Sequence, residues 1–109
     1  MLISDTPFGV TDWSTVEGTL HPGEAGTALW RTRQLGEIRV RMVDYSPGYI
    51  SDHWCSKGHI VLCVEGEFDV ELDDGRVVRL IPGQIFHVGD GAEPHRSRSE
   101  RGARLFIVD

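Results

Sequence analysis

The chain has few of the features that would place it in a membrane or in a disulfide-linked secreted class. It has only two cysteines, Cys55 and Cys63, and no apolar stretch approaches the roughly 20 residues that a membrane-spanning helix needs. Its first residues, MLISDTPFGV, lack the basic start, apolar run and cleavage site of a secretory signal. We therefore expect a cytoplasmic protein with no membrane partner.

Positive charge is also scarce. Eleven Lys and Arg stand against seventeen Asp and Glu, and the net charge of −6 would repel a phosphate backbone over most of the surface. We therefore expect no nucleic-acid partner. The arginines nevertheless gather in two groups, for which a solvated face of a sheet is the preferred interpretation. The groups are Arg31, Arg33, Arg39 and Arg41, and Arg96, Arg98, Arg101 and Arg104.

Helical periodicity is absent as well. No window of about a dozen residues carries apolar residues at the i, i+3, i+4 and i+7 spacing of an amphipathic helix. Thirteen glycines and five prolines divide the chain into short segments instead, which predicts an all-β fold with antiparallel strands in a sandwich or barrel. The expected strands cover residues 27–34, 37–45, 49–55, 59–64, 67–72, 76–80, 84–88, 95–99 and 103–108.

Two segments outside these strands have a definite expected form. Asp74-Gly75 lies between two alternating runs and predicts a hairpin with a tight type I′ turn, which needs positive φ at both central positions. Residues 1–25 are rich in Thr, Gly, Pro and acidic residues, and we expect an irregular arm that lies over a barrel edge. Nothing divides residues 1–109, so we expect one domain.

Residues able to bind a metal gather in two short segments. These segments are His53-Trp54-Cys55-Ser56-Lys57-Gly58-His59 and Glu93-Pro94-His95. Because side chains alternate along a strand, His53 and Cys55 are expected on one face of the strand 49–55. If residues 56–58 form a turn, His59 opens the next strand and can face the same interior. Converging imidazole and thiolate groups suit a transition-metal ion, whereas separately hydrogen-bonded histidines with Cys55 in the core are the alternative.

The spacing of these residues resembles the first motif of the cupin superfamily, which runs Gly, five residues, His-x-His, three or four residues, Glu, six residues and Gly. Gly48, His53, Cys55, His59 and Gly66 stand at these positions or within one residue of them. Residues 83–95 approximate a second cupin motif, which has a turn and a late histidine. The resemblance covers about residues 37–108 and implies a single-domain cupin, an RmlC-like antiparallel jelly-roll β-barrel that holds one metal ion.

Two departures from the motif affect the metal. Cys55 replaces the second histidine, and His59 replaces the glutamate. The string Asp52-His53-Trp54-Cys55 resembles a small subgroup, the DHCW-motif cupins. The implied ligands are His53, Cys55, His59 and His95, and the implied cofactor is a divalent transition metal such as Zn, Fe or Ni. If Cys55 only lies nearby, a three-histidine site with open positions results.

Neighbouring residues have weaker claims to a role. Glu93 is a candidate general acid or base at the barrel mouth, although an exposed turn carboxylate is the preferred interpretation. Asp52 is expected to be structural, with orientation of an imidazole as the alternative. His87 is left outside the site. Trp54 is expected to point away from the interior and to pack between sheets or subunits.

Two of the expected strands indicate what the chain binds, a second copy of itself and a small molecule. Strand 59–64 is apolar on both faces, so we expect both faces to be buried, the outer one against a second copy; cupins are commonly dimers, and a homodimer is the expected assembly. In strand 37–45, Arg39 and Arg41 alternate with apolar residues. If the arginine face looks inward, these guanidinium groups would select an anionic substrate.

The leading hypothesis for function is a metal-dependent enzyme that acts on a small molecule in the barrel. Dioxygenase chemistry is slightly preferred because the ligand shell is rich in histidine and poor in carboxylate, and isomerase or lyase chemistry is the next expectation. The alternative is a non-catalytic binding or sensor protein, in which the metal is structural or anchors the ligand. An open coordination position would favour the enzyme or the sensor, and a closed tetrahedron the structural role.

Overall fold

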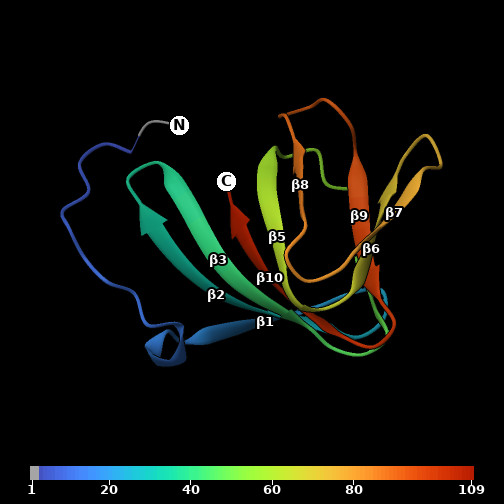
Figure 1. Ribbon diagram of the computed structural model, residues 1–109, viewed down its shortest axis with the longest axis horizontal. Helices are drawn as coiled ribbons and strands as arrows, with labels where there is room; N and C mark the ends of the chain where they lie inside the picture. The colour runs from blue at the N-terminus through green and yellow to red at the C-terminus, as the bar shows by residue number, and fades with distance from the viewer. Residues whose placement is uncertain (1–2) are drawn as a thin grey trace.

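The computed structural model describes residues 3–109 and consists of two antiparallel sheets that enclose the core between them, as a jelly roll (Figure 1). The strands are β1 (Gly18–Pro22), β2 (Thr27–Leu35), β3 (Ile38–Tyr45), β4 (Tyr49–Ile50), β5 (His59–Gly66), β6 (Phe68–Leu72), β7 (Val77–Leu80), β8 (Ile85–Val88), β9 (His95–Ser99) and β10 (Ala103–Val108). One sheet has the order β1-β2-β3-β10-β5-β8 and the other the order β4-β9-β6-β7. The predicted all-β antiparallel fold is confirmed.

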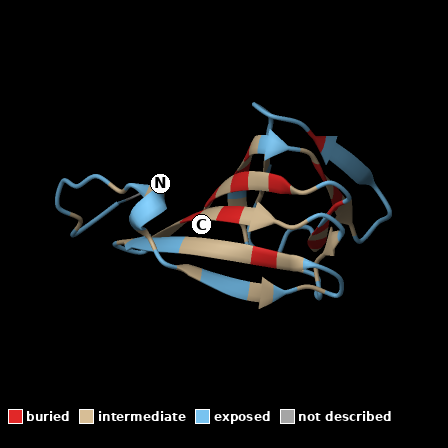
Figure 2. Cartoon of the chain, turned by 90° about the horizontal axis from the view of Figure 1, so that it is seen from below, coloured by how far each residue is buried: buried red, intermediate tan, exposed pale blue. Residues whose placement is uncertain are grey.

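The core lies between the inner faces of the two sheets (Figure 2). Alternation along the strands selects its members, because every second side chain of a strand points inward. In β10 the residues at positions 103, 105 and 107 are buried, and in β5 Val61 and Cys63 are buried as the sequence predicts. Phe68 and Val70 of β6 close the core from the other sheet.

The expected strand 49–55 is wrong in its second half. β4 has only two residues, and the chain then bends through Asp52 and His53 and returns to make an isolated bridge between Cys55 and His95. Residues 52–54 are all exposed, and none of them pairs with a neighbouring strand. Side-chain alternation therefore does not carry from His53 to Cys55.

The expected irregular arm at residues 1–25 is also partly wrong. β1 lies within it and pairs with β2 over five residues, from Gly18 opposite Arg31 to Pro22 opposite Thr27. A short 3-10 helix, Trp13–Thr15, precedes it. Pro22 is acceptable because β1 is an edge strand, and a proline at the end of an edge strand removes no ladder hydrogen bond.

The predicted hairpin at Asp74-Gly75 is confirmed, since β6 pairs with β7, but its turn differs from the expectation. The Gly75 amide donates to the Leu72 carbonyl (3.0 Å), and the Leu72 amide donates to the Arg76 carbonyl (2.8 Å), which closes a loop of residues 73–75. Gly75 has φ +95°, and in residues 3–109 Asp5 is the one non-glycine residue with positive φ. The longer loop needs left-handed backbone at one position only, and glycine occupies it.

The outer face of the larger sheet stays partly open in the single chain. Ile60 of β5 and Ile85 of β8 are 44% and 56% exposed, so the expectation that both faces of strand 59–64 are buried does not hold within one chain. The expected homodimer stays a prediction. Among residues 3–109, no helix has the length and hydropathy that crossing a bilayer requires.

Replacement of two glycines by alanine separates backbone strain from steric crowding. Gly66 and Gly75 both have positive φ (+70° and +95°), but a Cβ would lie 2.3 Å from the Gly102 carbonyl oxygen at Gly66 and meet nothing within 4 Å at Gly75. We expect Gly75→Ala to lower the free energy of unfolding by about 1–2 kcal/mol. Gly66→Ala should cost at least about 1 kcal/mol more, because backbone atoms must also shift. Equal losses in urea titrations of the two variants would contradict this account.

Candidate functional site

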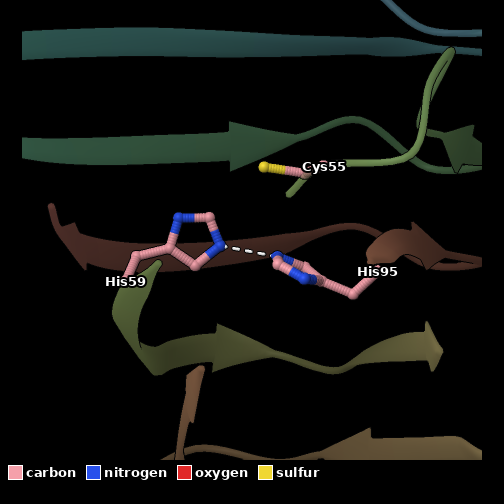
Figure 3. A group of neighbouring side chains, drawn as sticks. All are labelled: Cys55, His59 and His95. Carbon is pink, nitrogen blue, oxygen red and sulfur yellow. Dashed lines mark hydrogen bonds between the residues drawn. The ribbon is translucent and has the colours of Figure 1, made fainter. Parts of the chain in front are cut away.

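Three side chains with metal-binding atoms converge at one end of the core (Figure 3). They are Cys55, His59 and His95, and the atoms that they offer all lie within 4.8 Å of one another. The two imidazole Nε2 atoms are 2.7 Å apart. His95 is buried, while Cys55 and His59 are half-buried.

Backbone pairing places each of these residues. Cys55 and His95 form an isolated antiparallel bridge. The Cys55 amide donates to the His95 carbonyl (2.7 Å), and the His95 amide donates to the Cys55 carbonyl (3.0 Å). His95 is the first residue of β9, and His59 is the first residue of β5. The bridge thus positions Cys55 and His95, and the start of β5 positions His59.

Hydrogen bonds orient both imidazoles. His95 Nδ1 lies 2.9 Å from the carbonyl oxygen of Glu93, and His59 Nδ1 lies 3.3 Å from Oδ2 of Asp109. A carbonyl and a carboxylate only accept, so each Nδ1 donates and each Nε2 of the neutral ring carries a lone pair. Two lone pairs that face each other across 2.7 Å repel unless a cation lies between them. Burial lowers the pKa of His59, and the bond to Asp109 only partly opposes this effect, so a proton is disfavoured there.

Asp109 holds this end of the molecule together. The chain ends at the tip of β10, between β3 and β5 (Figure 1), and the Asp109 carboxylate is fully buried. Arg39 binds it through Nε (2.8 Å) and Nη2 (3.0 Å), and Arg41 binds it through Nη2 (2.8 Å). Burial alone would raise the pKa of Asp109, but the two arginines and His59 outweigh it and lower the pKa to about 2. The carboxylate is therefore ionised at neutral pH.

A cavity of about 270 Å³ opens beside the three ligands. Its walls combine aromatic and aliphatic side chains with a few polar groups, the pattern of small-molecule sites. The apolar and aromatic lining consists of Trp30, Val43, Tyr45, Tyr49, Val61, Phe86, Leu105 and Ile107. Cys55, His59 and His95 all line it, so a metal ion held by them would be reached from this space.

The structure brings together three of the four predicted ligands and leaves His53 out of the group. The His53 side chain is 72% exposed at the rim of the cavity, and its Nδ1 lies 2.6 Å from Oδ1 of Asp52. Asp52 thus orients the imidazole of His53 rather than one of the three clustered ligands. The reason is the break after β4, because His53 and Cys55 no longer belong to one alternating strand.

The other predicted residues lie away from the three ligands. Glu93 is on the surface, where it pairs with Arg76 and does not line the cavity; only its backbone carbonyl serves the site. The Trp54 side chain is exposed, and Cζ of the Arg96 guanidinium group lies 4.6 Å from the centre of its ring. His87 is exposed on β8, outside the cavity lining, in agreement with its omission from the predicted site.

The preferred expectation of a solvated arginine face on strand 37–45 is wrong for Arg41. Arg41 is 5% exposed and lines the cavity together with Arg39. The alternative, an inward arginine face, describes this strand. In the sequence, the arginines of this strand alternate with apolar residues. This alternation separates the two faces of the strand, but it does not say which face points inward. Asp109 and Trp30 carried no local signal, because their roles depend on strands that meet only in the fold.

Neither a family model nor a curated protein matches this sequence. Solved structures do match. An ectoine synthase from P. lautus is 19% identical with a TM-score of 0.74, and the match covers 93% of this chain and 76% of that chain. An RmlC-like cupin from Shewanella frigidimarina NCIMB 400 is 21% identical with a TM-score of 0.69, over 96% of this chain and 88% of that chain.

A sugar phosphate isomerase from a cupin superfamily, from Silicibacter pomeroyi DSS-3, is 19% identical with a TM-score of 0.69, over 92% of this chain and 74% of that chain. At these identities the likeness establishes the fold. It agrees with the two antiparallel sheets that enclose the core. The chain has the cupin fold.

Proposed function

We propose that the chain is a metal-dependent enzyme that acts on a small molecule. The observation that carries this proposal is that Cys55, His59 and His95 form a three-residue ligand set with one side open to a cavity. Catalytic metal sites keep a position for water or substrate, whereas structural zinc sites close with four protein ligands. His53, the fourth predicted ligand, lies at the rim and leaves that position open.

The donor set fits a divalent transition metal, and we propose Zn, Fe or Ni. Imidazole and thiolate groups suit these ions, and Mg²⁺ or Ca²⁺ would require oxygen ligands. When bound, such an ion supplies a Lewis acid and lowers the pKa of coordinated water. The chain itself presents Nε2 of both histidines, accepts hydrogen bonds from their Nδ1 groups at the Glu93 carbonyl and the Asp109 carboxylate, and lines the cavity with apolar side chains.

Among reaction classes, we propose dioxygenase chemistry first, and isomerase or lyase chemistry next. The set has two histidines and one thiolate and no carboxylate ligand, which favours iron over manganese. Aromatic and aliphatic side chains form a large part of the wall beside the ligands. The alternative function is a binding or sensor protein that keeps its ligand unchanged, and the same open cavity favours it over a structural metal.

Metal content should depend on the three clustered ligands and not on the fourth prediction. We expect near-stoichiometric metal in untagged wild-type protein and its loss in His59→Ala and His95→Ala, since each removes one of three donors. Cys55→Ser should bind metal more weakly because the thiolate is the one charged ligand. Inductively coupled plasma mass spectrometry measures all of these.

His53→Ala and His87→Ala are the matched histidine controls, and both should keep the wild-type metal content. Loss of metal in His53→Ala would show that residues 51–54 rearrange to complete a four-ligand shell. No metal in the wild type, and no uptake of Zn(II), Fe(II) or Ni(II), would contradict the proposed function.

Asp109 should act as a positioning residue for His59. Asp109→Asn removes the charge that accepts the His59 Nδ1 proton, and loss of such an outer partner typically weakens metal binding about 10- to 100-fold. Asp44→Asn is the matched control, because Asp44 also binds two arginines, Arg31 and Arg104, but lies outside the cavity. In competition with a chelator, the metal affinity should fall only for Asp109→Asn, even if both variants lose thermal stability. Equal metal affinity in the two variants would show that Asp109 does not position His59 for metal binding.

Reaction class can be separated by metal and oxygen. If the chain is a dioxygenase, Fe(II)-loaded protein should consume oxygen in proportion to the loss of one member of a panel of small organic acids and phenols. Zn(II)-loaded protein should not, and neither should His95→Ala that has been treated with Fe(II) in the same way. Conversion of a substrate by zinc-loaded protein without oxygen would favour an isomerase or lyase instead. Binding of a panel member with no turnover under either condition would favour the sensor.

A further inference from the structure

The cavity carries the opposite charge to the protein as a whole. The chain has a net charge of −6, yet the cavity is lined by four cationic side chains, Arg39, Arg41, Lys57 and Arg96, and by one carboxylate, Asp109. A concave site with walls of one sign and low polarity concentrates the field and attracts ligands of the opposite sign. Beside the metal ligands, the lining therefore favours an anionic small molecule over a cationic one.

Arg41 is the cation in this lining that water screens least. Its side chain is 6% exposed, and its guanidinium group lies 4.3 Å from the centre of the Trp30 ring. Within residues 3–109 it donates one hydrogen bond, from Nη2 to Asp109, and its buried Nε has no acceptor. A buried charged group that lacks acceptors costs free energy unless a further partner is supplied.

Neutralisation of Asp109 does not account for Arg41. Arg39 already grips both carboxylate oxygens of Asp109, the two-point geometry in which one guanidinium balances one carboxylate. The side chains of Arg39 and Arg41 carry two positive charges, and the side chain of Asp109 carries one negative charge. A divalent ion would add more positive charge than the Cys55 thiolate offsets. The side chains of the inner cavity thus carry a surplus of positive charge.

We propose that the cavity binds a small organic anion whose carboxylate or phosphate group is held by Arg41, while another atom of the same molecule faces the Cys55–His59–His95 cluster. This inference rests on the proposed function, because it names the substrate class of the same site.

The distances between the two ends suit one small molecule. Arg41 Nη2 and His59 Nδ1 both reach the same oxygen of Asp109, Oδ2, at 2.8 and 3.3 Å. The guanidinium group and the imidazole are therefore neighbours across a single carboxylate. A volume of about 270 Å³ is small for a ligand site and admits a compact acid rather than a long chain. The planar fork of arginine matches either carboxylate or phosphate oxygens.

Three small molecules test whether binding depends on the charge of the ligand or on its shape, and whether the site prefers a carboxylate or a phosphate. Glycolate has a hydroxyl group and a carboxylate, glycolamide is its neutral analogue, and inorganic phosphate reports the other head group. Isothermal titration of Zn(II)-loaded wild-type protein should detect glycolate or phosphate, and glycolamide should bind at least about 10-fold more weakly. Whichever anion binds more tightly identifies the head group, and both results support the proposal.

Arginine dependence decides whether Arg41 is responsible, since a carboxylate also binds zinc directly. Arg41→Lys keeps a charge for Asp109 but loses the planar fork, and we expect anion binding to weaken about 10-fold or more at unchanged metal content. Lys57→Gln changes an exposed member of the lining and should weaken binding a few-fold, which keeps the proposal testable if Arg41→Lys folds poorly. Arg33→Gln, on the exposed part of β2 outside the lining, should bind as the wild type does.

Anion affinity that is unchanged in both Arg41→Lys and Lys57→Gln would overturn the inference, and so would equal affinity of the zinc-loaded wild type for glycolate and glycolamide. Failure of the proposed function gives a different result, because the wild type would then take up no metal at all. In that case titration of the metal-free protein still tests the anion site. A preference for anions that Arg41→Lys abolishes would support it, and no preference would overturn it.

Discussion

A buried carboxylate has to be surrounded by donors, and Asp109 is the point at which this requirement organises one end of the molecule. The Asp109 amide and carbonyl pair with the backbone of Arg39, and its side chain accepts from Arg39, Arg41 and His59. The same oxygen that receives the guanidinium of Arg41 receives the imidazole proton of His59. The charge balance of β3 and the direction of the His59 ring at the start of β5 are thus set together.

From that constraint the metal site follows in steps. With Nδ1 of His59 held by Asp109 and Nδ1 of His95 held by the Glu93 carbonyl, both Nε2 lone pairs are directed to one place. The Cys55–His95 bridge then brings a thiol to the same place from a segment that belongs to neither of the adjacent strands. A cavity lies beside this point, and the ligands face it rather than packed side chains alone.

Electrostatics and packing act together in this cavity. Arg41 is kept in place by an aromatic face on Trp30 and by one carboxylate oxygen, so it is ordered before any ligand binds. An ordered cation in a site with apolar walls interacts more strongly with an anion than a solvated one does, because less water screens the charge and less side-chain freedom is lost. The proposed metal and the proposed anion site therefore support one another: each adds positive charge that a single anionic ligand can balance.

The sequence by itself determined the fold class, most strand positions and two histidines of the cluster. Gly and Pro spacing with two-residue alternation depends on local backbone preferences, and this is why β5, β9 and β10 lie close to where the pattern places them. His59 and His95 each open a regular strand, so their positions were predictable, and Cys55 lies two residues beyond His53 in the expected segment. Only the tertiary structure decided that the chain leaves the ladder after Ile50, which carries His53 to the rim. It also decided that the arginine face of β3 is the inner one, because alternation distinguishes two faces without saying which meets the other sheet, and Asp109 reaches that face only when β10 has paired between β3 and β5.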